Sequence, residues 1–370
     1  MGQRQCPLEK MVRKVTPGFW ACQRVFITGH TGFKGTWLTL MLGRLGAQIT
    51  GFSLDPPTQP NLFQLAHQDG DVRDIRGDIR DLAMLRQAMH NSAPTVVLHL
   101  AAQSLVLASY RDPVGTYATN VMGTVHVMEA LRTCASVRAA VIVTSDKCYE
   151  NREWYWPYRE TDSLGGHDPY SSSKACADLT TSAYSRSFLN AANMLVATAR
   201  AGNVIGGGDW AADRLVPDIV RALGVGNMPT LRHPEAVRPW QHVLEPLYGY
   251  LLLAQHLAEG KQEMAESWNF GPDASALRSV GWIAQTMLDL WGGSTTVQMD
   301  ITQHAHEAGL LSLDSSKARA KLGWQPRLSV LEAVAWTVAG YKSMAASETG
   351  PARAICLEQI DRYLSLQQHP

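Results

Sequence analysis

Residues 24–35 read RVFITGHTGFKG, a β-branched and aromatic run followed by three glycines at intervals of three. The apolar residues of 37–45 recur at helical spacing, and Gly46 marks the end of that helix. Residues 48–54 are again apolar and predict a second strand. Strand, glycine turn, helix and strand together form one βαβ unit.

The alternation of strands and helices continues to about residue 200. Continuous apolar runs predict strands at 95–101, 139–144 and 194–199, and helical patterns cover 117–131 and 170–188. Strands that are apolar throughout are buried on both faces, which is typical of a parallel sheet between two helix layers. The sequence therefore predicts an α/β fold: a Rossmann-type doubly wound parallel sheet with a smaller mixed α/β C-terminal substrate lobe.

Glycines and prolines punctuate shorter elements from about residue 202 onward. We expect an N-terminal extension at 1–20 and a nucleotide-binding Rossmann domain at 21–200. A substrate lobe follows at 201–346, with room for some of its segments to return to the first domain. The last residues, 347–370, are polar and predict a peripheral segment.

The composition excludes several classes of protein. With 33 basic and 33 acidic side chains, the chain has no net charge to draw it to nucleic acid or a membrane surface. Its apolar runs fall well short of the ~20 residues that span a bilayer. The basic N-terminus lacks the apolar stretch of a secretory signal. We therefore expect a cytoplasmic protein that binds neither nucleic acid nor membrane.

The six cysteines are scattered and include no Cys-x-x-Cys pair, which argues against a zinc site or a disulfide framework. Reduced thiols fit the cytoplasm. His304 and His306 lie in a polar stretch without a third ligand, so we expect solvated histidines and no bound metal.

The pattern Gly29-x-x-Gly32-x-x-Gly35 follows a strand and opens a helix. Bare backbone can approach a pyrophosphate closely, and the helix N-terminus offers free N–H groups. This context favours a dinucleotide site over the alternative, a tight turn without a ligand.

The cofactor is predicted from the end of the second strand, where Ser53 stands in the usual place of an acid that binds ribose. No Arg or Lys of this strand end is available for a 2′-phosphate, so NAD is favoured over NADP. Asp55 either contributes here or caps the turn before Pro56. Asp78 either accepts from the adenine amino group or caps the helix that begins near Leu82.

Tyr170 and Lys174 lie four apart on a predicted helix and therefore share a face. We expect the ammonium to lower the phenol pKa from ~10 toward neutrality, so that tyrosinate can take a hydroxyl proton as hydride leaves. Ser145, at the end of the strand 139–144, can share that proton. Asp146 and Lys147 follow it, either as a general acid with its neighbour or as a structural pair that caps the loop.

These features together resemble the extended short-chain dehydrogenases/reductases, which combine such a glycine turn, HLAA at 99–102, Ser145 and Tyr170-x-x-x-Lys174. Longer strings resemble the CDP-glucose 4,6-dehydratase family in particular. They are GHTGFKG at 29–35, PPT at 56–58, TSDKCY at 144–149, RAGNVIGGGDW at 200–210 and RPWQHV at 238–243. The resemblance runs from about Phe19 into the C-terminal lobe.

The resemblance implies a lyase that converts CDP-D-glucose to CDP-4-dehydro-6-deoxy-D-glucose. Hydride passes from C4 to NAD and returns to C6, with loss of water. Tyr170 would take the C4 hydroxyl proton, and Asp146 would protonate the departing C6 hydroxyl. The group that removes the C5 proton stays open among three alternatives: Lys147, Tyr170 acting a second time, or another group. Lys147 stands where the dTDP-glucose dehydratases have Glu.

The resemblance also implies the binding residues. Those for the cofactor are Gly29, Thr31, Gly32, Phe33, Lys34, Gly35, Ser53, Asp78, Ile79, Leu100, Ala101, Ala102, Tyr170 and Lys174. Those for the substrate are Gln103, Asn203, Arg214, Leu215, Arg238 and Asn269. Arg238 suits a diphosphate through its fork of donors, although packing beside Trp240 is the alternative.

The sequence supports three further expectations. Residues 154–158 form either a lid over the sugar or an aromatic packing patch. Cys148 is an inert buried thiol. A homodimer or higher homo-oligomer is expected from the family.

Other functions compete with this one. A 4-epimerase, a 4-keto reductase or a 4,6-dehydratase for another nucleotide would use the same fold, but epimerisation requires no acid for a leaving hydroxyl, so Asp146 discriminates. A non-catalytic NAD(P)-sensing regulator would have no need of Ser145, Tyr170 and Lys174 together.

Overall fold

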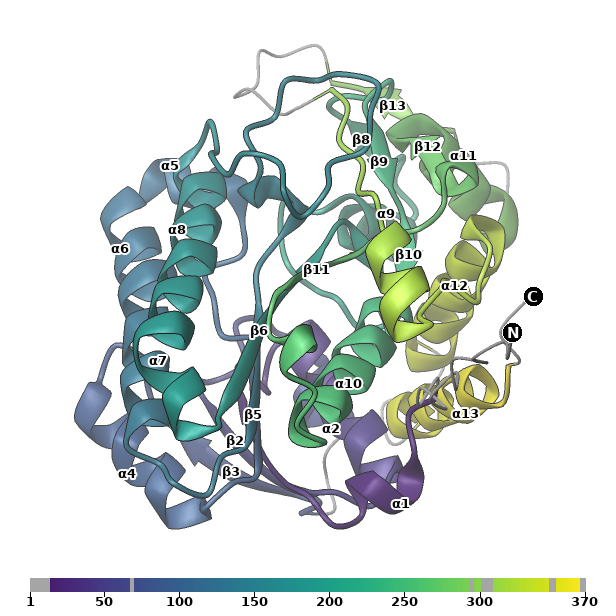
Figure 1. Ribbon diagram of the computed structural model, residues 1–370. Helices are drawn as coiled ribbons and strands as arrows, with labels where there is room; N and C mark the ends of the chain where they lie inside the picture. The colour runs from purple at the N-terminus through teal and green to yellow at the C-terminus, as the bar shows by residue number, and fades with distance from the viewer. Residues whose placement is uncertain (1–13, 67–69, 293–295, 301–308, 346–350, 367–370) are drawn as a thin grey trace, which may run out of the picture.

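The computed structural model describes residues 14–66, 70–292, 296–300, 309–345 and 351–366. A seven-stranded sheet forms its centre, in the order β11-β6-β5-β4-β1-β2-β3, and every neighbouring pair is parallel (Figure 1). Its strands are β1 (Arg24–Thr28), β2 (Gln48–Ser53), β3 (Val72–Arg76), β4 (Val96–His99), β5 (Ala139–Val143), β6 (Leu195–Ala201) and β11 (Ser267–Phe270). All five residues of β5 are buried, as its continuous apolar sequence predicts.

Helices cover both faces of this sheet (Figure 1). On one face lie α4 (Leu82–Ser92), α7 (Gly123–Arg132) and α8 (Pro169–Tyr184), with short elements α5 (Val106–Arg111), α6 (Pro113–Tyr117), η1 (Ala118–Met122), η3 (Ser185–Leu189) and η4 (Asn190–Ala192) beside them. On the other face lie α2 (Phe33–Arg44) and α10 (Leu244–Ala258), while α1 (Pro17–Trp20), α3 (Leu62–Ala66) and α13 (Pro351–Ser365) pack around them. The Rossmann-type layers expected from the sequence are confirmed.

The smaller lobe contains three two-stranded sheets, which pair β10 with β7, β12 with β9 and β13 with β8. Its strands are β7 (Val204–Ile205), β8 (Thr230–Leu231), β9 (Val237–Pro239), β10 (Gln241–His242), β12 (Leu277–Ser279) and β13 (Gln298–Met299). Its helices are α9 (Leu215–Gly224), α11 (Val280–Trp291) and α12 (Val330–Ala345), which share a separate apolar core. The remaining short turns are η2 (Asp146–Cys148), η5 (Gln262–Met264), η6 (Ala274–Ala276) and η7 (Ala318–Leu322).

The chain beyond residue 200 does not stay in the smaller lobe. Strand β11 pairs with β6 at the edge of the central sheet, and α10 packs on β5 and β6. These are segments that return to the first domain, for which the sequence division left room. The predicted helix at 117–131 is interrupted, since a π-helical turn at 118–122 joins α6 to α7.

The C-terminal segment differs from the expectation that it is peripheral. Helix α13 packs against α2, and Cys356, Ile360 and Tyr363 are completely buried in the main core. These residues are three to four apart and therefore form one helical face. The prediction was wrong because average polarity hid a narrow apolar stripe.

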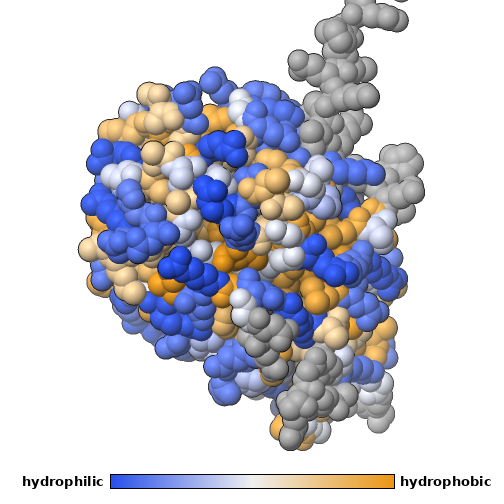
Figure 2. All heavy atoms as spheres, turned by 90° about the horizontal axis from the view of Figure 1, so that it is seen from below, coloured by the Kyte–Doolittle hydropathy of each residue, from blue (hydrophilic) through white to orange (hydrophobic). Residues whose placement is uncertain are grey.

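The described residues also bear on the expectations for membrane spans, metal ligands and surface character. Within the described ranges no helix combines the length and the apolar character that crossing a bilayer requires. The described residues also form no group of three or more side chains able to hold a metal ion. The predicted solvated pair His304 and His306 lies outside the described residues. The face in Figure 2 intersperses hydrophilic with hydrophobic residues, as in an ordinary globular surface.

A buried carboxyl group ties α10 to the C-terminal part of the chain. Glu245 is fully buried, and one of its oxygens accepts from the N–H groups of Arg327 and Leu328 at 2.9 and 2.7 Å. Its other oxygen accepts from the Tyr363 hydroxyl at 2.7 Å. Burial outweighs these bonds and raises the pKa of Glu245 from 4.5 to about 7.

This raised pKa predicts a loss of stability with pH. The folded state favours neutral Glu245, so the contribution is complete below pH 4.5 and disappears as pH rises through about 7. We expect denaturant unfolding to show a loss of up to about 3 kcal/mol over this range, and Glu245→Gln to reduce it. The control is Glu358→Gln, at an exposed position on α13. An unchanged pH dependence in Glu245→Gln would contradict the assignment.

Candidate active site

A cavity of about 560 Å³ opens at the carboxyl ends of the central strands. In open parallel sheets ligands bind at this edge, where the strand order reverses, here between β1 and β4. The loops after β1, β2, β4 and β5 line the cavity from the first domain. The loop after β6 and the start of α9 line it from the smaller lobe, so both lobes build the site.

All residues predicted to bind the cofactor line this cavity. They are Gly29, Thr31, Gly32, Phe33, Lys34, Gly35, Ser53, Asp78, Ile79, Leu100, Ala101, Ala102, Tyr170 and Lys174. Ser145, Asp146, Lys147, Asn203, Arg214, Leu215 and Arg238 line it as well. Gln103 and Asn269 do not.

The glycine turn fits tightly against the sheet edge. A Cβ at Gly35 would lie 2.1 Å from the Gly29 carbonyl oxygen, and one at Gly29 would lie 2.6 Å from the Ala101 nitrogen. Gly29 also has a φ of +79°, which L side chains rarely adopt. Helix α2 begins directly after Gly32, and its first turn faces the cavity. Bare backbone beside a helix N-terminus is the arrangement that holds a dinucleotide pyrophosphate.

The ribose end of the cavity corrects one expectation. Ser53 ends β2, and its hydroxyl hydrogen-bonds with that of Thr31 at 2.8 Å. An arginine does lie at this strand end: Arg76 of β3 stands opposite Ser53 and donates to the Leu54 carbonyl at 3.1 Å. The residues of β2 alone do not reveal this arginine, because the parallel register brings it from the neighbouring strand β3. Arg76 also binds Asp74 at 2.6 Å, and it does not line the cavity.

The structure excludes one of the two alternatives for Asp78, the helix cap. Asp81, not Asp78, caps α4, because its carboxylate accepts from the Met84 N–H at 2.9 Å. Asp78 lines the cavity and accepts from the Arg80 backbone at 2.8 Å. The side-chain hydrogen bond from Arg80 lowers the pKa of Asp78, which therefore stays ionised. Asp55 is exposed at the rim.

The turn after β5 brings an acid and two hydroxyl groups together. The Ser145 hydroxyl donates to one carboxyl oxygen of Asp146 at 3.0 Å and is hydrogen-bonded to the Tyr170 phenol. It also accepts from the Lys147 N–H at 3.2 Å. The second carboxyl oxygen of Asp146 is buried and has no hydrogen-bond partner among the described residues. Burial raises the pKa of Asp146 above that of an exposed aspartate, which favours the protonated carboxyl group.

The predicted downward pKa shift of Tyr170 is wrong. Tyr170 and Lys174 do share a face of α8, but burial raises the pKa of the phenol to about 12, against the lowering effect of Ser145. The Lys174 ammonium donates to the Val143 carbonyl oxygen at 3.1 Å. Burial lowers the pKa of Lys174 itself to about 8. The helical spacing predicts that the Lys174 charge lies near Tyr170 and favours tyrosinate. The desolvation that outweighs this effect on the Tyr170 pKa depends on the packing around the cavity, which the spacing does not show.

Lys34, in the glycine turn, brings another amine to the site. Its ammonium lies 5.9 Å from the centre of the Tyr250 ring. Burial, together with the positive charges of Arg214 and Lys174, lowers the pKa of Lys34 to about 8. The charge of Asp146 acts in the opposite direction.

Two arginines of the smaller lobe reach the cavity by different routes. Arg214 donates to Asp209 at 2.8 Å and to the Ser104 hydroxyl at 2.9 Å, which connects the two lobes. Ser104 also lines the cavity, although the sequence analysis did not select it. Arg238 is largely buried and donates to the Gly309 carbonyl at 3.2 Å. Their charges make this end of the cavity suitable for a diphosphate.

Asn269 was predicted to contact substrate, but the structure assigns it to the core. Its side chain is fully buried, and its carbonyl oxygen accepts from the Tyr149 hydroxyl at 2.7 Å. Its amide donates to the carbonyl oxygens of Tyr158 at 2.9 Å and Asp314 at 3.1 Å. The end of β11 points these groups at a neighbouring loop, a direction that the strand pattern alone does not give.

Gln103 is likewise committed to local structure. Its side-chain oxygen accepts from the Leu105 N–H at 2.6 Å, and its amide donates to the Thr116 hydroxyl at 3.0 Å. These bonds hold the turn after β4 and direct the side chain away from the cavity. The neighbouring Ser104 takes its place on the cavity wall.

The aromatic stretch 154–158 forms a packing patch and not a wall of the cavity. Trp154 stacks on Tyr158 with ring centres 5.4 Å apart, and Tyr158 stacks on Tyr149 at 5.1 Å. Tyr155 and Trp156 are exposed. None of these residues lines the cavity, so the packing alternative fits better than the lid.

Comparison with known proteins agrees with the cavity. The family model described as GDP-mannose 4,6-dehydratase matches residues 26–337. The chain is 47% identical to CDP-glucose 4,6-dehydratase of Salmonella typhimurium, over 95% of this chain and 99% of that protein. It is 26% identical to dTDP-glucose 4,6-dehydratase of Xanthomonas campestris, over 85% and 92% of the two chains.

Solved structures show the same fold. The dTDP-glucose 4,6-dehydratase DesIV of Streptomyces venezuelae, solved with NAD and TYD bound, superposes with a TM-score of 0.75 at 26% identity. It covers 87% of this chain and 98% of its own. A UDP-glucose 4-epimerase of Thermotoga maritima also gives 0.75, at 21% identity and 87% and 99% coverage, which concerns the fold alone.

The fold and the cavity define an extended short-chain dehydrogenase/reductase that acts on a nucleotide sugar. Within that superfamily the chain belongs to the 4,6-dehydratases, and to the family of CDP-glucose 4,6-dehydratase. The family expected from the sequence motifs is confirmed.

The tight glycine turn predicts how dinucleotide binding can be weakened. Gly35→Ala should raise the dissociation constant for NAD about tenfold or more, since its Cβ would displace the Gly29 carbonyl; tenfold corresponds to about 1.4 kcal/mol. Isothermal titration measures this constant. Gly43→Ala, on the same helix with no atom within 4 Å of the added Cβ, is the matched control. Equal affinity in the two variants would contradict this reading of the turn.

Proposed function

We propose that the protein converts CDP-D-glucose to CDP-4-dehydro-6-deoxy-D-glucose, with NAD as a recycled cofactor and loss of water. The proposal rests on the identity with CDP-glucose 4,6-dehydratase, which extends over nearly the whole chain. The NAD-bound relative and the glycine turn support the cofactor. The geometry contributes one decisive observation, the buried acid Asp146.

Asp146 separates dehydration from the other reactions of this fold. Burial raises its pKa, and its second carboxyl oxygen is unpartnered among the described residues and adjoins the cavity. A neutral carboxyl group in that position can protonate the departing C6 hydroxyl. An epimerase or a keto reductase has no leaving hydroxyl and gains nothing from such an acid.

The residues present fit NAD as the cofactor. The glycine turn has no space for side chains, and every predicted cofactor residue lines one continuous cavity. When bound, NAD would accept hydride from C4 of the sugar and return it to C6. Gly29, Gly32 and Gly35 would hold its pyrophosphate, and Ser53 and Asp78 would face its adenosine.

The side chains move the protons. Tyr170 and Ser145 share a hydrogen bond, so the serine hydroxyl can relay the C4 hydroxyl proton to Tyr170 once the phenol has lost its own proton and is a phenolate. A charged Asp146 opposes formation of tyrosinate, and the raised pKa of Asp146 reduces that opposition by favouring its neutral form. We propose two alternative routes for the C5 proton: transfer to Lys147, or transfer to Tyr170 after the phenol has released the proton that it took from the C4 hydroxyl.

The smaller lobe would hold the nucleotide diphosphate. Arg214 and Arg238 bring two guanidinium groups to one end of the cavity, and Asn203 and Leu215 lie beside them. Arginine forks match phosphate oxygens in geometry and charge. The sugar then extends toward Asp146 and Tyr170 at the sheet edge.

The experiment that tests this function offers NAD with CDP-, dTDP-, UDP- and GDP-glucose separately. We expect loss of water from CDP-glucose, detected by mass spectrometry and by the alkaline absorbance of a 4-keto-6-deoxy product. Asp146→Asn should slow water loss by about a hundredfold or more, as for removal of a general acid. Tyr170→Phe should abolish hydride transfer and water loss together.

The outcomes discriminate among the alternatives. Product from another nucleotide sugar alone would replace CDP-glucose as the substrate. Formation of an epimer without loss of water would favour the 4-epimerase. Binding of a nucleotide sugar without turnover of any of the four would favour the non-catalytic NAD(P)-sensing regulator.

We also propose a homodimer formed through the face of α8. Helix α8 packs beside α6 and η1, and all three carry exposed apolar side chains, among them Val114, Met122 and Leu179. Sedimentation analysis should give twice the chain mass, and Leu179→Glu should shift it to the monomer. Leu331→Glu, at a similarly exposed leucine on α12, is the control. A monomeric wild-type protein would contradict the proposal.

We propose a cytoplasmic location because the described cysteines are unpaired thiols. Five cysteines within the described residues are free, and three of them are buried. Unpaired thiols persist in a reducing compartment.

A further inference from the structure

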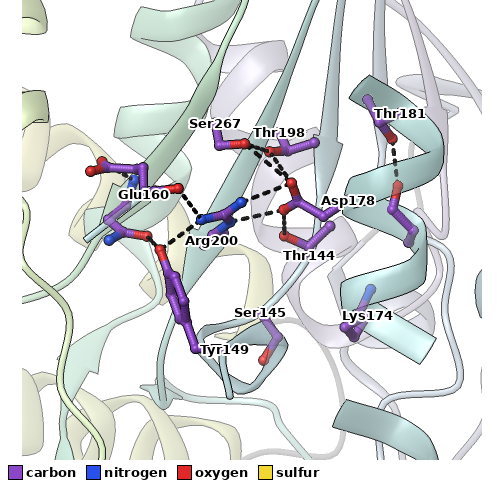
Figure 3. A network of polar contacts seen from close by, with 12 residues as sticks. Thr144, Ser145, Tyr149, Glu160, Lys174, Asp178, Thr181, Thr198, Arg200 and Ser267 are labelled. Atoms are coloured by element: carbon purple, nitrogen blue, oxygen red, sulfur yellow. Dashed lines mark hydrogen bonds and ion pairs between the residues drawn. The ribbon is translucent and has the colours of Figure 1, made fainter. Parts of the chain in front are cut away.

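A buried ion pair joins α8, which carries Tyr170 and Lys174, to β6 (Figure 3). The guanidinium of Arg200, in β6, donates to both carboxylate oxygens of Asp178, in α8, at 2.8 Å each. Neither side chain is more than 3% exposed. The carboxylate also accepts from the hydroxyls of Thr144, Thr198 and Ser267 at 3.1, 3.2 and 3.1 Å. The groups that donate to it come from β6, β11 and the residue that follows β5.

The contacts of this pair reach both ends of the catalytic turn. Thr144 directly precedes Ser145, so its bond to Asp178 fixes the start of the turn. At the other end, Arg200 donates to the Tyr149 hydroxyl at 2.7 Å, and its guanidinium carbon lies 4.9 Å from the centre of that ring (Figure 3). Residues 144–149 are therefore anchored on both sides of the acid.

The same pair fixes the catalytic helix. Asp178 lies one turn beyond Lys174 and two turns beyond Tyr170, on the same face of α8. A guanidinium fork that holds Asp178 leaves α8 little freedom to rotate or slide against β6. One ion pair thus sets the turn and the helix relative to each other.

Stability alone does not explain this arrangement. Asp178, Arg200 and Tyr149 do not line the cavity, so they touch neither substrate nor cofactor there. A buried ion pair loses most of its Coulomb attraction to desolvation, and well-packed apolar side chains often stabilise a fold as well. The fork supplies a fixed orientation that apolar contacts would not.

We propose that Arg200 and Asp178 are positioning residues that hold the Ser145–Asp146–Lys147 turn and the Tyr170–Lys174 helix in the register required for dehydration. This inference rests on the proposed function.

The charge of Asp178 provides a second effect that can be measured. Burial lowers the pKa of Lys174 to about 8, and Asp178 opposes that shift. The other ionisable groups that face Lys174 are Cys148, His99 and Lys34. Burial keeps Cys148 a thiol by raising its pKa, and it keeps His99 neutral by lowering its pKa to about 3. Removing the Asp178 charge should therefore deprotonate Lys174 at lower pH.

The first test is Asp178→Asn, assayed with CDP-glucose and NAD across pH. We expect kcat to fall about tenfold to a hundredfold, as a small misplacement of reacting groups does, while KM stays nearly unchanged. The alkaline limb should move down by about half a pH unit or more. Glu245→Gln, another fully buried carboxyl but remote from the cavity, is the matched control and should keep the wild-type limb.

The second test separates charge from geometry. Arg200→Lys keeps the positive charge and loses the fork, so it should lower kcat without moving the alkaline limb. Asp178→Leu combined with Arg200→Met removes both charges and retains apolar bulk, which guards against a failure to fold. Wild-type kcat in this folded double variant, or in Asp178→Asn, would overturn the proposal.

A readout without turnover distinguishes this inference from the proposed function. Hydrogen exchange of the free protein should accelerate in residues 144–149 and 169–178 of Asp178→Asn, and not in those of Glu245→Gln. If the wild-type protein dehydrates no nucleotide sugar, the proposed function fails while this local exchange still tests the positioning. Uniform acceleration over the whole chain, or none, would overturn it.

Discussion

Burial of the central sheet on both faces is the constraint on which the rest of this structure depends. Helix layers take every apolar side chain of β4 and β5 out of water, so polar groups gather where these strands end. The carboxyl edge between β1 and β4 is open because the chain leaves the sheet there in opposite directions. Position of the cavity therefore follows from topology before any functional side chain is considered.

Desolvation at that edge then sets the chemistry. The same burial moves the pKa values of Asp146 and Tyr170 upward and those of Lys34 and Lys174 downward. Acidic and basic groups thus share one environment. Burial disfavours the charged form of each, so it raises the pKa of groups that become anions and lowers the pKa of groups that become cations. A neutral acid beside a phenol suits elimination of a hydroxyl group, which distinguishes a dehydratase from an epimerase on the same fold.

Polar groups behind the cavity stabilise the loops around it and do not line it. Arg200 and Asp178 pair without contact to the cavity, and Asn269 and Gln103 fill their hydrogen bonds within the protein. Arg200 belongs to a string that resembles the family, and Gln103 and Asn269 were expected to bind substrate. Their side chains instead stabilise the loops that carry Ser145, Asp146 and Ser104. Resemblance in sequence therefore marks the neighbourhood of a site more reliably than it assigns contacts.

The sequence by itself determined the strands of the Rossmann unit, the glycine turn and the Tyr170–Lys174 pair, because each is encoded by local spacing. It also identified Asp146, through the string TSDKCY at 144–149 that resembles the CDP-glucose 4,6-dehydratase family. Only the tertiary structure decided where Arg76, Gln103 and Asn269 point, why α13 belongs to the core, and which way the pKa of Tyr170 moves. The physical reason is that register, side-chain direction and desolvation depend on residues distant in sequence, which no local pattern contains.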